Sequence, residues 1–306
     1  MALLKHASNV PGCALAIEEL FRYAGFGTGV FTTLLIGGHL AGDVIDNPHV
    51  AAVTLTGSTP AGRAVAARAG EKLKKTVLEL GGSDAYLVLE DADLDAAIDT
   101  CVTSRLLNSG QSCIAAKRFV VVKTVLEPFI RGLLQRMKAV TMGTPLKEDV
   151  QIGPLARTDL RDELHRQVQE SLAAGARLLL GGKLPDSAGA FYPPTVLTDV
   201  GAGMPAYDEE LFGPVAAVIP VDDEDQAVRV ANDSPFGLGA AVFTRDTVRG
   251  ERIAAHELEA GCCFVNDLVR SDPRLPFGGI KQSGYGRELG AIGIREFTNQ
   301  KTIVVK

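Results

Sequence analysis

The 306-residue sequence lacks several features that would assign its class at once. No run of about 18 uninterrupted apolar residues is present, which excludes a membrane-spanning helix. Its 31 basic residues are outnumbered by 37 acidic ones, and a net charge of −6 repels polyanions such as nucleic acid. No basic n-region followed by an apolar h-region marks a secretory signal. We therefore expect a cytoplasmic protein without membrane or nucleic-acid partners.

The cysteines and histidines are also too few or too scattered to stabilise the fold through disulfide bonds or a bound metal. The five Cys form an odd number without C-x-x-C spacing, which indicates reduced thiols, one of them available for chemistry. The five His do not cluster at metal-ligand spacing, and the neighbours Cys262 and Cys263 cannot easily chelate one metal from a strand. We expect no metal site, and a length sufficient for two domains.

Short β-branched runs alternate with amphipathic stretches, a pattern typical of an α/β protein with a largely parallel sheet. Apolar residues at three- and four-residue spacing predict one helix over 94–106, ending near Gly110, and another over 158–172. Residues 1–4 resemble part of a further strand. Nine strands are expected, over 32–36, 53–56, 76–80, 85–89, 119–122, 176–180, 216–219, 240–243 and 262–265.

The segment NSGQSCIAAKR over 108–118 places the thiol of Cys113 on a glycine-containing turn between a helix and a strand. Such turns expose functional atoms. An isolated cysteine is more often a small buried hydrophobe. The nearby Lys117 and Arg118, and the backbone N–H at the turn, favour a reactive thiolate instead.

The segment TVLELGGS over 76–83 ends a strand in two glycines just after Glu79. Desolvation there would raise the pKa of Glu79 and make it a base near neutral pH. The alternative is a solvated or ion-paired carboxylate.

The segment LTGSTPAGR over 55–63 leads from a strand through a small-residue turn into a helix with Pro60 in its first turn. This arrangement presents backbone N–H groups and a positive dipole end to phosphate. Many helices with the same start bind nothing, and the G-x-G-x-x-G fingerprint is absent.

These three segments, in this order, resemble the aldehyde dehydrogenase superfamily. Further motifs are Lys5, ELFGP at 210–214, FGLG at 236–239 and PFGGIKQSGYGRE at 276–288. The 34 residues between Glu79 and Cys113 (113 minus 79) also match the family's spacing. The resemblance extends from Ala2 to the C-terminus and is closest to the NADP-linked succinate-semialdehyde branch.

The resemblance implies an α/β fold with an incomplete Rossmann-type cofactor domain and an α/β catalytic domain. The expected boundaries are 1–82 for the cofactor domain, 83–283 for the thiol domain and 284–306 for a C-terminal return with an oligomerisation strand. A homo-oligomer is expected, or a complementary N-terminal fragment as partner.

The resemblance also implies a chemistry. Cys113 would attack the aldehyde carbon, a hydride would leave to nicotinamide, and Glu79 would activate the water that hydrolyses the thioester. The implied cofactor contacts are Lys5, Ser8, Gly57, Ser58, Leu80, Gly81, Glu210 and Phe212. The implied substrate contacts are Arg105, Asn266, Arg270 and Phe277.

Ser8 bears on the choice of cofactor. NAD-preferring members often carry a carboxylate at this position, which would repel a 2′-phosphate, whereas a hydroxyl can donate to it. With Lys5 nearby, we expect NADP, with NAD as the alternative. Ser8 as a simple helix N-cap is the other interpretation.

A distal carboxylate on the substrate would need a cation, and arginine suits it best. Leu107 stands where some members carry that arginine, so Arg105, Arg270 and Arg274 are the candidates. Arg270 and Arg274 are equally well explained as surface charges. Succinate semialdehyde as substrate therefore rests on the resemblance.

One family feature is missing. The oxyanion hole normally uses an Asn from a Pro-Trp-Asn-Phe motif upstream, and this chain has no Trp at all. Loss of one such donor costs about 10²- to 10³-fold in rate, so we expect weak or no aldehyde oxidation by this chain. The alternatives are a non-catalytic remnant or interaction subunit, and a thiol-dependent esterase that uses Cys113.

Overall fold

The computed structural model describes all residues, 1–306. The chain divides into two compact units, each described separately below. The smaller comprises Met1–Val53 and Arg63–Thr76, and the larger comprises Thr54–Gly62 and Val77–Lys306. The division runs through three elements, β3 (Ala52–Thr56), α3 (Thr59–Glu71) and β4 (Lys75–Glu79). The domain boundaries expected at residues 82 and 283 stay a prediction.

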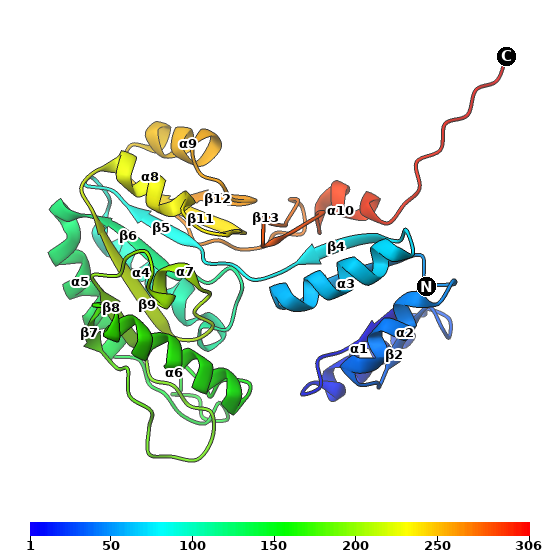
Figure 1. The fold of residues 1–306 in the computed structure, drawn as a ribbon, viewed down its shortest axis with the longest axis horizontal. Helices are drawn as coiled ribbons and strands as arrows, with labels where there is room; N and C mark the ends of the chain where they lie inside the picture. The colour runs from blue at the N-terminus through cyan, green and yellow to red at the C-terminus, as the bar shows by residue number, and fades with distance from the viewer. The chain divides into compact units, whose positions relative to one another are not determined.

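A seven-stranded sheet in the order β12-β11-β5-β6-β9-β8-β7 forms the centre of the larger unit (Figure 1). All neighbours are parallel except β7 and β8, as predicted for an α/β protein. The strands are β5 (Ala85–Val88), β6 (Arg118–Val122), β7 (Arg177–Leu180), β8 (Thr195–Thr198), β9 (Val215–Val221), β11 (Gly239–Phe243) and β12 (Cys262–Val265). Only β8 was not anticipated, because it is a four-residue segment directly after two prolines.

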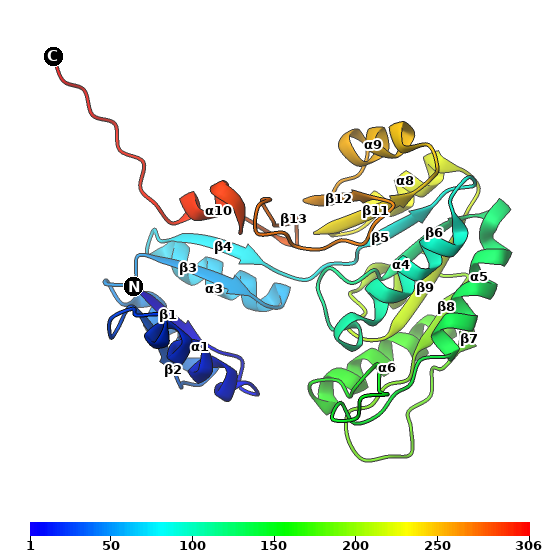
Figure 2. The ribbon, with the colours of Figure 1, turned by 180° about the vertical axis from the view of Figure 1, so that it is seen from behind.

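Helices cover both faces of this sheet because successive strand residues point to opposite sides. Tyr86 and Val88 pack on α4 (Leu94–Leu106) and α5 (Lys123–Lys138), which lie together on one face (Figure 2). Leu87 lies in the cluster on the other face. That face is covered by α6 (Thr158–Ala173), α8 (Glu224–Asn232) and α9 (Thr247–His256). All three strand residues are fully buried.

Helix α4 begins and ends close to where its periodicity predicts. Asp93 caps it by accepting a hydrogen bond from the backbone N–H of Ala96 at 3.3 Å. Beyond its end, Asn108 and Ser109 adopt left-handed φ angles of 53° and 56°, and Gly110 follows at 78°. These residues form the short helix η2 (Leu107–Gly110), which redirects the chain into the loop that carries the cysteine.

The predicted helix α6 is also present and begins at residue 158, as expected. Arg157 stands at its N-cap and makes no side-chain capping bond. Asp159 in the first turn supplies negative charge instead, which the helix dipole favours.

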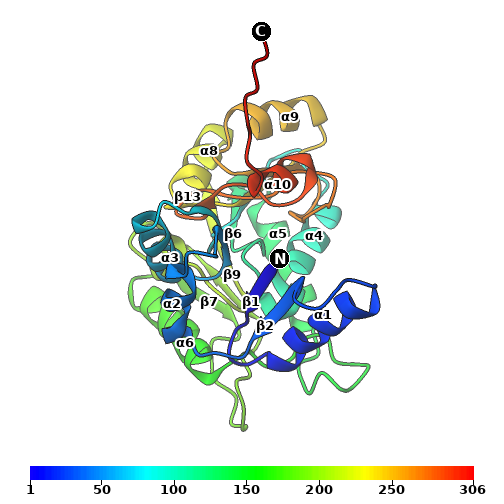
Figure 3. The ribbon, with the colours of Figure 1, turned by 90° about the vertical axis from the view of Figure 1, so that its right-hand side faces the viewer.

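The smaller unit contains β1 (Ala2–Lys5) and β2 (Phe31–Leu34), which pair in parallel beside α1 (Pro11–Tyr23) (Figure 3). The strand expected at the start of the chain is therefore confirmed. Phe21 of α1 stacks on Phe31 of β2 with ring centroids 4.6 Å apart. The remaining elements of this unit are η1 (Gly38–Leu40) and α2 (Ala41–Asp46).

Short elements close the C-terminal part of the larger unit. Strand β10 (Phe236–Gly237) pairs with β13 (Ile280–Lys281), and β14 (Gly284–Tyr285) pairs with β4. Two further helices are α7 (Pro205–Asp208) and α10 (Gly290–Glu296). Residues 301–306 form no strand within a single chain, so an oligomerisation strand there stays a prediction. None of the helices is long and apolar enough to cross a membrane.

Candidate active site

The predicted nucleophile lies at the amino ends of the parallel strands. Cys113 is in the loop just before β6, Asp84 precedes β5, and Glu210 precedes β9. Because parallel strands start at the same edge of a sheet, these segments meet although the chain separates them widely.

The Cys113 loop is fastened by Lys117. The Lys117 Nζ donates to the carbonyl oxygens of Ser112 at 2.9 Å, Cys113 at 2.8 Å and Ala115 at 3.3 Å. Gly82 packs against the same loop, since a Cβ at this position would stand 2.6 Å from the Cys113 oxygen. The loop therefore tolerates no larger residue at 82 without shifting.

The electrostatic environment of the Cys113 thiol opposes its ionisation. Burial raises its pKa to about 11, and the charges of Asp84, Glu210 and Glu79 act in the same direction. The ammonium of Lys117 acts against them and lowers this pKa. A thiolate at neutral pH therefore depends on the cation beside it and on a group that accepts the proton.

Glu79 ends strand β4, where it pairs with Gly284 of β14. The side chain is only 2% exposed, and neither carboxylate oxygen has a hydrogen-bond partner. Burial raises its pKa to about 8, Glu288 adds to the rise, and Arg287 opposes it. The pKa rise expected from desolvation is confirmed, and it leaves a carboxylate able to exchange a proton near neutral pH.

Glu79 and Cys113 belong to the same compact unit. The charge of Glu79 is one of those that raise the Cys113 pKa, so the two groups are close enough to interact electrostatically. Glu79 and Cys113 therefore do not lie on opposite sides of the molecule.

Glu210 reaches the same place from the loop before β9. Its Oε1 accepts a hydrogen bond from the Gly82 N–H at 3.0 Å and lies 3.4 Å from the Lys117 Nζ. A Cβ on Gly81 would stand 2.4 Å from the Glu210 Oε2. The two glycines predicted to end the strand therefore also leave room for the Glu210 carboxylate. Phe212, two residues further on, is half-buried.

Gly57 and Ser58 lie at the start of α3. The Gly57 N–H donates to the Glu79 carbonyl at 3.0 Å, and the Ser58 Oγ accepts from the Ala61 N–H at 3.4 Å. Gly62 lies closely against Leu80, where a Cβ would meet Cδ1 at 2.5 Å. Ser58 thus caps the helix, and its contact with phosphate stays a prediction.

Lys5 and Ser8 belong to the smaller unit. Lys5 is the half-buried last residue of β1, and Ser8 is exposed in the following turn. Helix α1 begins only at Pro11, with Val10 at its N-cap. The alternative of Ser8 as an N-cap is therefore wrong, and its role at the cofactor stays a prediction.

The four predicted substrate residues are placed in different surroundings. Arg105 is fully buried and donates from Nη2 to the Gly110 oxygen at 2.6 Å, while its Nε and Nη1 have no partner. Arg270 is exposed and ion-paired with Asp267 at 2.8 Å. Phe277 pairs through its backbone with Glu288.

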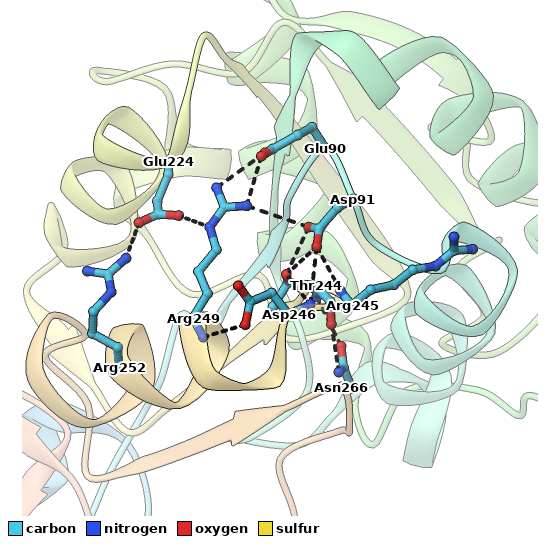
Figure 4. A network of polar contacts seen from close by, with 9 residues as sticks. All are labelled: Glu90, Asp91, Glu224, Thr244, Arg245, Asp246, Arg249, Arg252 and Asn266. Atoms are coloured by element: carbon cyan, nitrogen blue, oxygen red, sulfur yellow. Dashed lines mark hydrogen bonds and ion pairs between the residues drawn. The ribbon is translucent and has the colours of Figure 1, made fainter.

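Asn266, the fourth, uses its whole side-chain amide on Thr244 (Figure 4). The Thr244 N–H donates to Oδ1 at 3.0 Å, and Nδ2 donates to the Thr244 oxygen at 2.8 Å. These bonds give a structural reason for Asn266. A substrate contact by any of the four stays a prediction.

Lys117 and Arg118 are both expected from the sequence to be cations near the thiol, and for Arg118 this prediction is wrong. Its guanidinium points to the other face of the sheet, donating to the oxygens of Ser83 at 3.0 Å, Val230 at 2.8 Å and Ala231 at 2.9 Å. Neighbours in a strand alternate, so one of the two had to face away. The sequence did not single out Asp84 as a charged group near the thiol. Only its alignment with Lys117 in the sheet shows that it is one.

A match to a known family accounts for this arrangement. The aldehyde dehydrogenase family matches residues 1–303, almost the whole chain. The chain belongs to this family.

No cluster of three or more His, Cys, Asp or Glu side chains with the geometry to hold a metal ion is present.

Two curated relatives are named for one activity within the family. A probable succinate-semialdehyde dehydrogenase [NADP(+)] of Synechocystis is 51% identical over 303 residues. Succinate-semialdehyde dehydrogenase [NADP(+)] 1 of Mycobacterium tuberculosis is 50% identical over 303 residues. In both cases the match covers 99% of this chain and 66% of the relative. The chain thus spans about two thirds of the length of these relatives.

A solved structure agrees with the fold. The succinic semialdehyde dehydrogenase of Streptococcus pyogenes, in complex with NADP+, is 39% identical and superposes with a TM-score of 0.96. The superposition covers 99% of this chain and 66% of that protein. The expected α/β aldehyde dehydrogenase fold is confirmed.

Proposed function

We propose that the chain carries the thiol chemistry of an NADP-dependent oxidation of succinate semialdehyde to the carboxylic acid. The curated relatives named for this reaction, at about 50% identity, support the choice of substrate and cofactor. Cys113 is the proposed nucleophile and Glu79 the proposed base.

The residues of the larger unit fit a nicotinamide nucleotide. Glu210 presents a carboxylate held by the Gly82 N–H, and a carboxylate is a suitable acceptor for ribose hydroxyls. The closeness of Gly81 to Glu210 leaves no room for a side chain there. Within this unit, Ser58 and Glu210 would hold the cofactor. When bound, NADP supplies the acceptor for the hydride that the aldehyde carbon loses.

Cys113 and Glu79 act in different steps of the proposed reaction. The Cys113 sulfur forms a bond to the aldehyde carbon, which gives a thiohemiacetal and, after oxidation, a thioester. Glu79 takes a proton from water, and the resulting hydroxide attacks the thioester and releases acid and thiol. Because neither oxygen of Glu79 has a hydrogen-bond partner, the carboxylate is free for this water.

One observation carries the proposal. The buried Glu79 carboxylate, which has a pKa of about 8 and no hydrogen-bond partner, lies close enough to the Cys113 thiol to influence the thiol pKa. Structural ion pairs normally lower a carboxyl pKa, whereas a base needs a pKa near the working pH.

The test follows absorbance at 340 nm with purified chain, NADP and succinate semialdehyde. We expect Cys113→Ser to abolish NADPH formation. Glu79→Gln should slow steady turnover about 10²- to 10⁴-fold while a first burst of NADPH persists, because only thioester hydrolysis needs the base.

NADPH formation by Cys113→Ser at the measurable rate of the unaltered chain would refute the proposal. A chain that forms no NADPH but cleaves a p-nitrophenyl ester through Cys113 would also contradict it, in favour of a thiol-dependent esterase.

A further inference from the structure

We propose that Lys117 is a positioning residue that locks the Cys113 loop and the Glu210 carboxylate to one buried ammonium and thereby controls the reactivity of the thiol. This inference rests on the proposed role of Cys113. It adds a residue that is neither nucleophile nor base and that the sequence alone left undistinguished from Arg118.

Hydrogen-bond geometry is the first argument. The Lys117 side chain is 1% exposed, and its Nζ donates to three carbonyl oxygens of a single loop, those of Ser112, Cys113 and Ala115. A lysine ammonium has three N–H donors and no acceptor, so the donors and carbonyls match in number. A neutral amine would turn a lone pair toward one of these oxygens, so the loop selects the charged form.

The second argument is the position of Lys117 in the sheet. The pairing of β5 with β6 aligns Asp84 with Lys117 one residue before Ala85 and Arg118. Both side chains are buried, each 1% exposed. The backbone of the same two residues is joined as well, because the Lys117 N–H donates to the Asp84 oxygen at 3.0 Å.

Four charged groups therefore surround the ammonium or the thiol it serves. Burial lowers the pKa of Lys117, the charges of Glu210 and Asp84 raise it, and the charge of Arg105 lowers it further. At the thiol, Lys117 is the cation that lowers the pKa, whereas Asp84, Glu210 and Glu79 raise it. Asp84 itself has a pKa raised by burial to about 6, so it is ionised above that pH. Lys117 and Asp84 thus act on Cys113 in opposite directions.

The test is the pH dependence of Cys113 alkylation by iodoacetamide, measured on the full chain by mass spectrometry of the Cys113 peptide. No NADP and no aldehyde are needed, so a chain without turnover still tests this inference. We expect Lys117→Met to slow alkylation at pH 8 at least about tenfold, the loss that one unit of thiol pKa produces.

The companion variant is Asp84→Asn, which keeps an oxygen to accept from the Gly239 N–H at 3.1 Å but removes the charge. We expect it to speed alkylation at pH 8 about threefold or more, which corresponds to half a unit of thiol pKa. A structural role alone would move both variants in the same direction. If Lys117→Met does not fold, Asp84→Asn and the charge-retaining Lys117→Arg still decide the question.

The matched control is Arg118→Gln. It removes a buried cation one residue away that points to the other face, so it should lower the melting temperature while leaving the alkylation profile of Cys113 unchanged. An unchanged profile in Asp84→Asn, or an equal loss of reactivity in Arg118→Gln and Lys117→Met, would overturn the inference.

Discussion

At the scale of single residues, burial decides which charges can serve chemistry. Glu79 and Asp272 are both carboxylates, yet burial raises the pKa of Glu79 to about 8, whereas hydrogen bonds from Arg274 lower the pKa of the half-buried Asp272. The difference follows from desolvation, which penalises the anion when no donor compensates it.

Glu79 should also leave a signature in stability. Its pKa in the folded chain lies above the ordinary value of 4.5. The stability linked to its proton is therefore complete below about pH 4 and is lost as pH rises through about 8. We therefore expect the melting temperature of Glu79→Gln, relative to that of the unaltered chain, to rise by at least a few degrees from pH 5 to pH 9. One pKa unit is worth about 1.4 kcal/mol.

Melting curves at pH 5, 7 and 9 measure this gain. Asp95→Asn is the control for the carboxylate-to-amide substitution itself, because this side chain is 92% exposed. A Glu79→Gln difference that does not change with pH would show that the carboxyl group titrates normally.

At the scale of elements, a polar network joins the carboxyl ends of the strands, away from the candidate active site (Figure 4). Asp91, just after β5, accepts from the Thr244 Oγ1 at 2.8 Å and from the backbone N–H groups of Arg245 at 3.1 Å and Asp246 at 3.2 Å. Arg249 of α9 lies 3.7 Å from Asp91 and bonds Glu90 at 2.8 Å. The carboxylate therefore holds the turn between β11 and α9.

Asp91→Ala should destabilise the chain by about 1–2 kcal/mol, because three donors of that turn lose a charged acceptor. Urea unfolding measures the change as a lower midpoint. Asp95→Ala, an exposed partner of Arg136 at 3.1 Å, should stay within about 0.5 kcal/mol. Equal losses in the two variants would show that the network adds no more than a surface ion pair.

At the scale of the whole molecule, the two compact units differ in how much apolar surface they bury. The buried hydrophobic residues of the smaller unit are Ala14, Ile45 and Ala69, whereas the larger unit has two extensive clusters around its sheet. Few buried contacts mean a low free energy of local opening.

We therefore expect amide hydrogen exchange of the chain to proceed at least about tenfold faster in β1 and β2 than in β5, β6 and β9, since a difference of 1.4 kcal/mol in opening free energy suffices for that factor. Peptide-level mass spectrometry of the exchange measures it. Equal protection of β1 and β6 would contradict the expectation.

Much of the fold could be predicted because its signals are local. The β-branched runs, the spacing of apolar residues in α4 and the glycines at 81 and 82 each depend only on neighbouring residues. Cys113 and Glu79 could be singled out in the same way, from the turn and the strand end that carry them.

Only the tertiary structure decided which charges meet. The Gly82 to Glu210 bond joins residues 128 apart, and the Asp91 to Thr244 bond joins residues 153 apart. The choice between Lys117 and Arg118 depended on the face each strand residue takes, which is set by the register of β6 against its neighbours. Local propensity does not encode such pairings, because burial and register arise only when distant segments pack together.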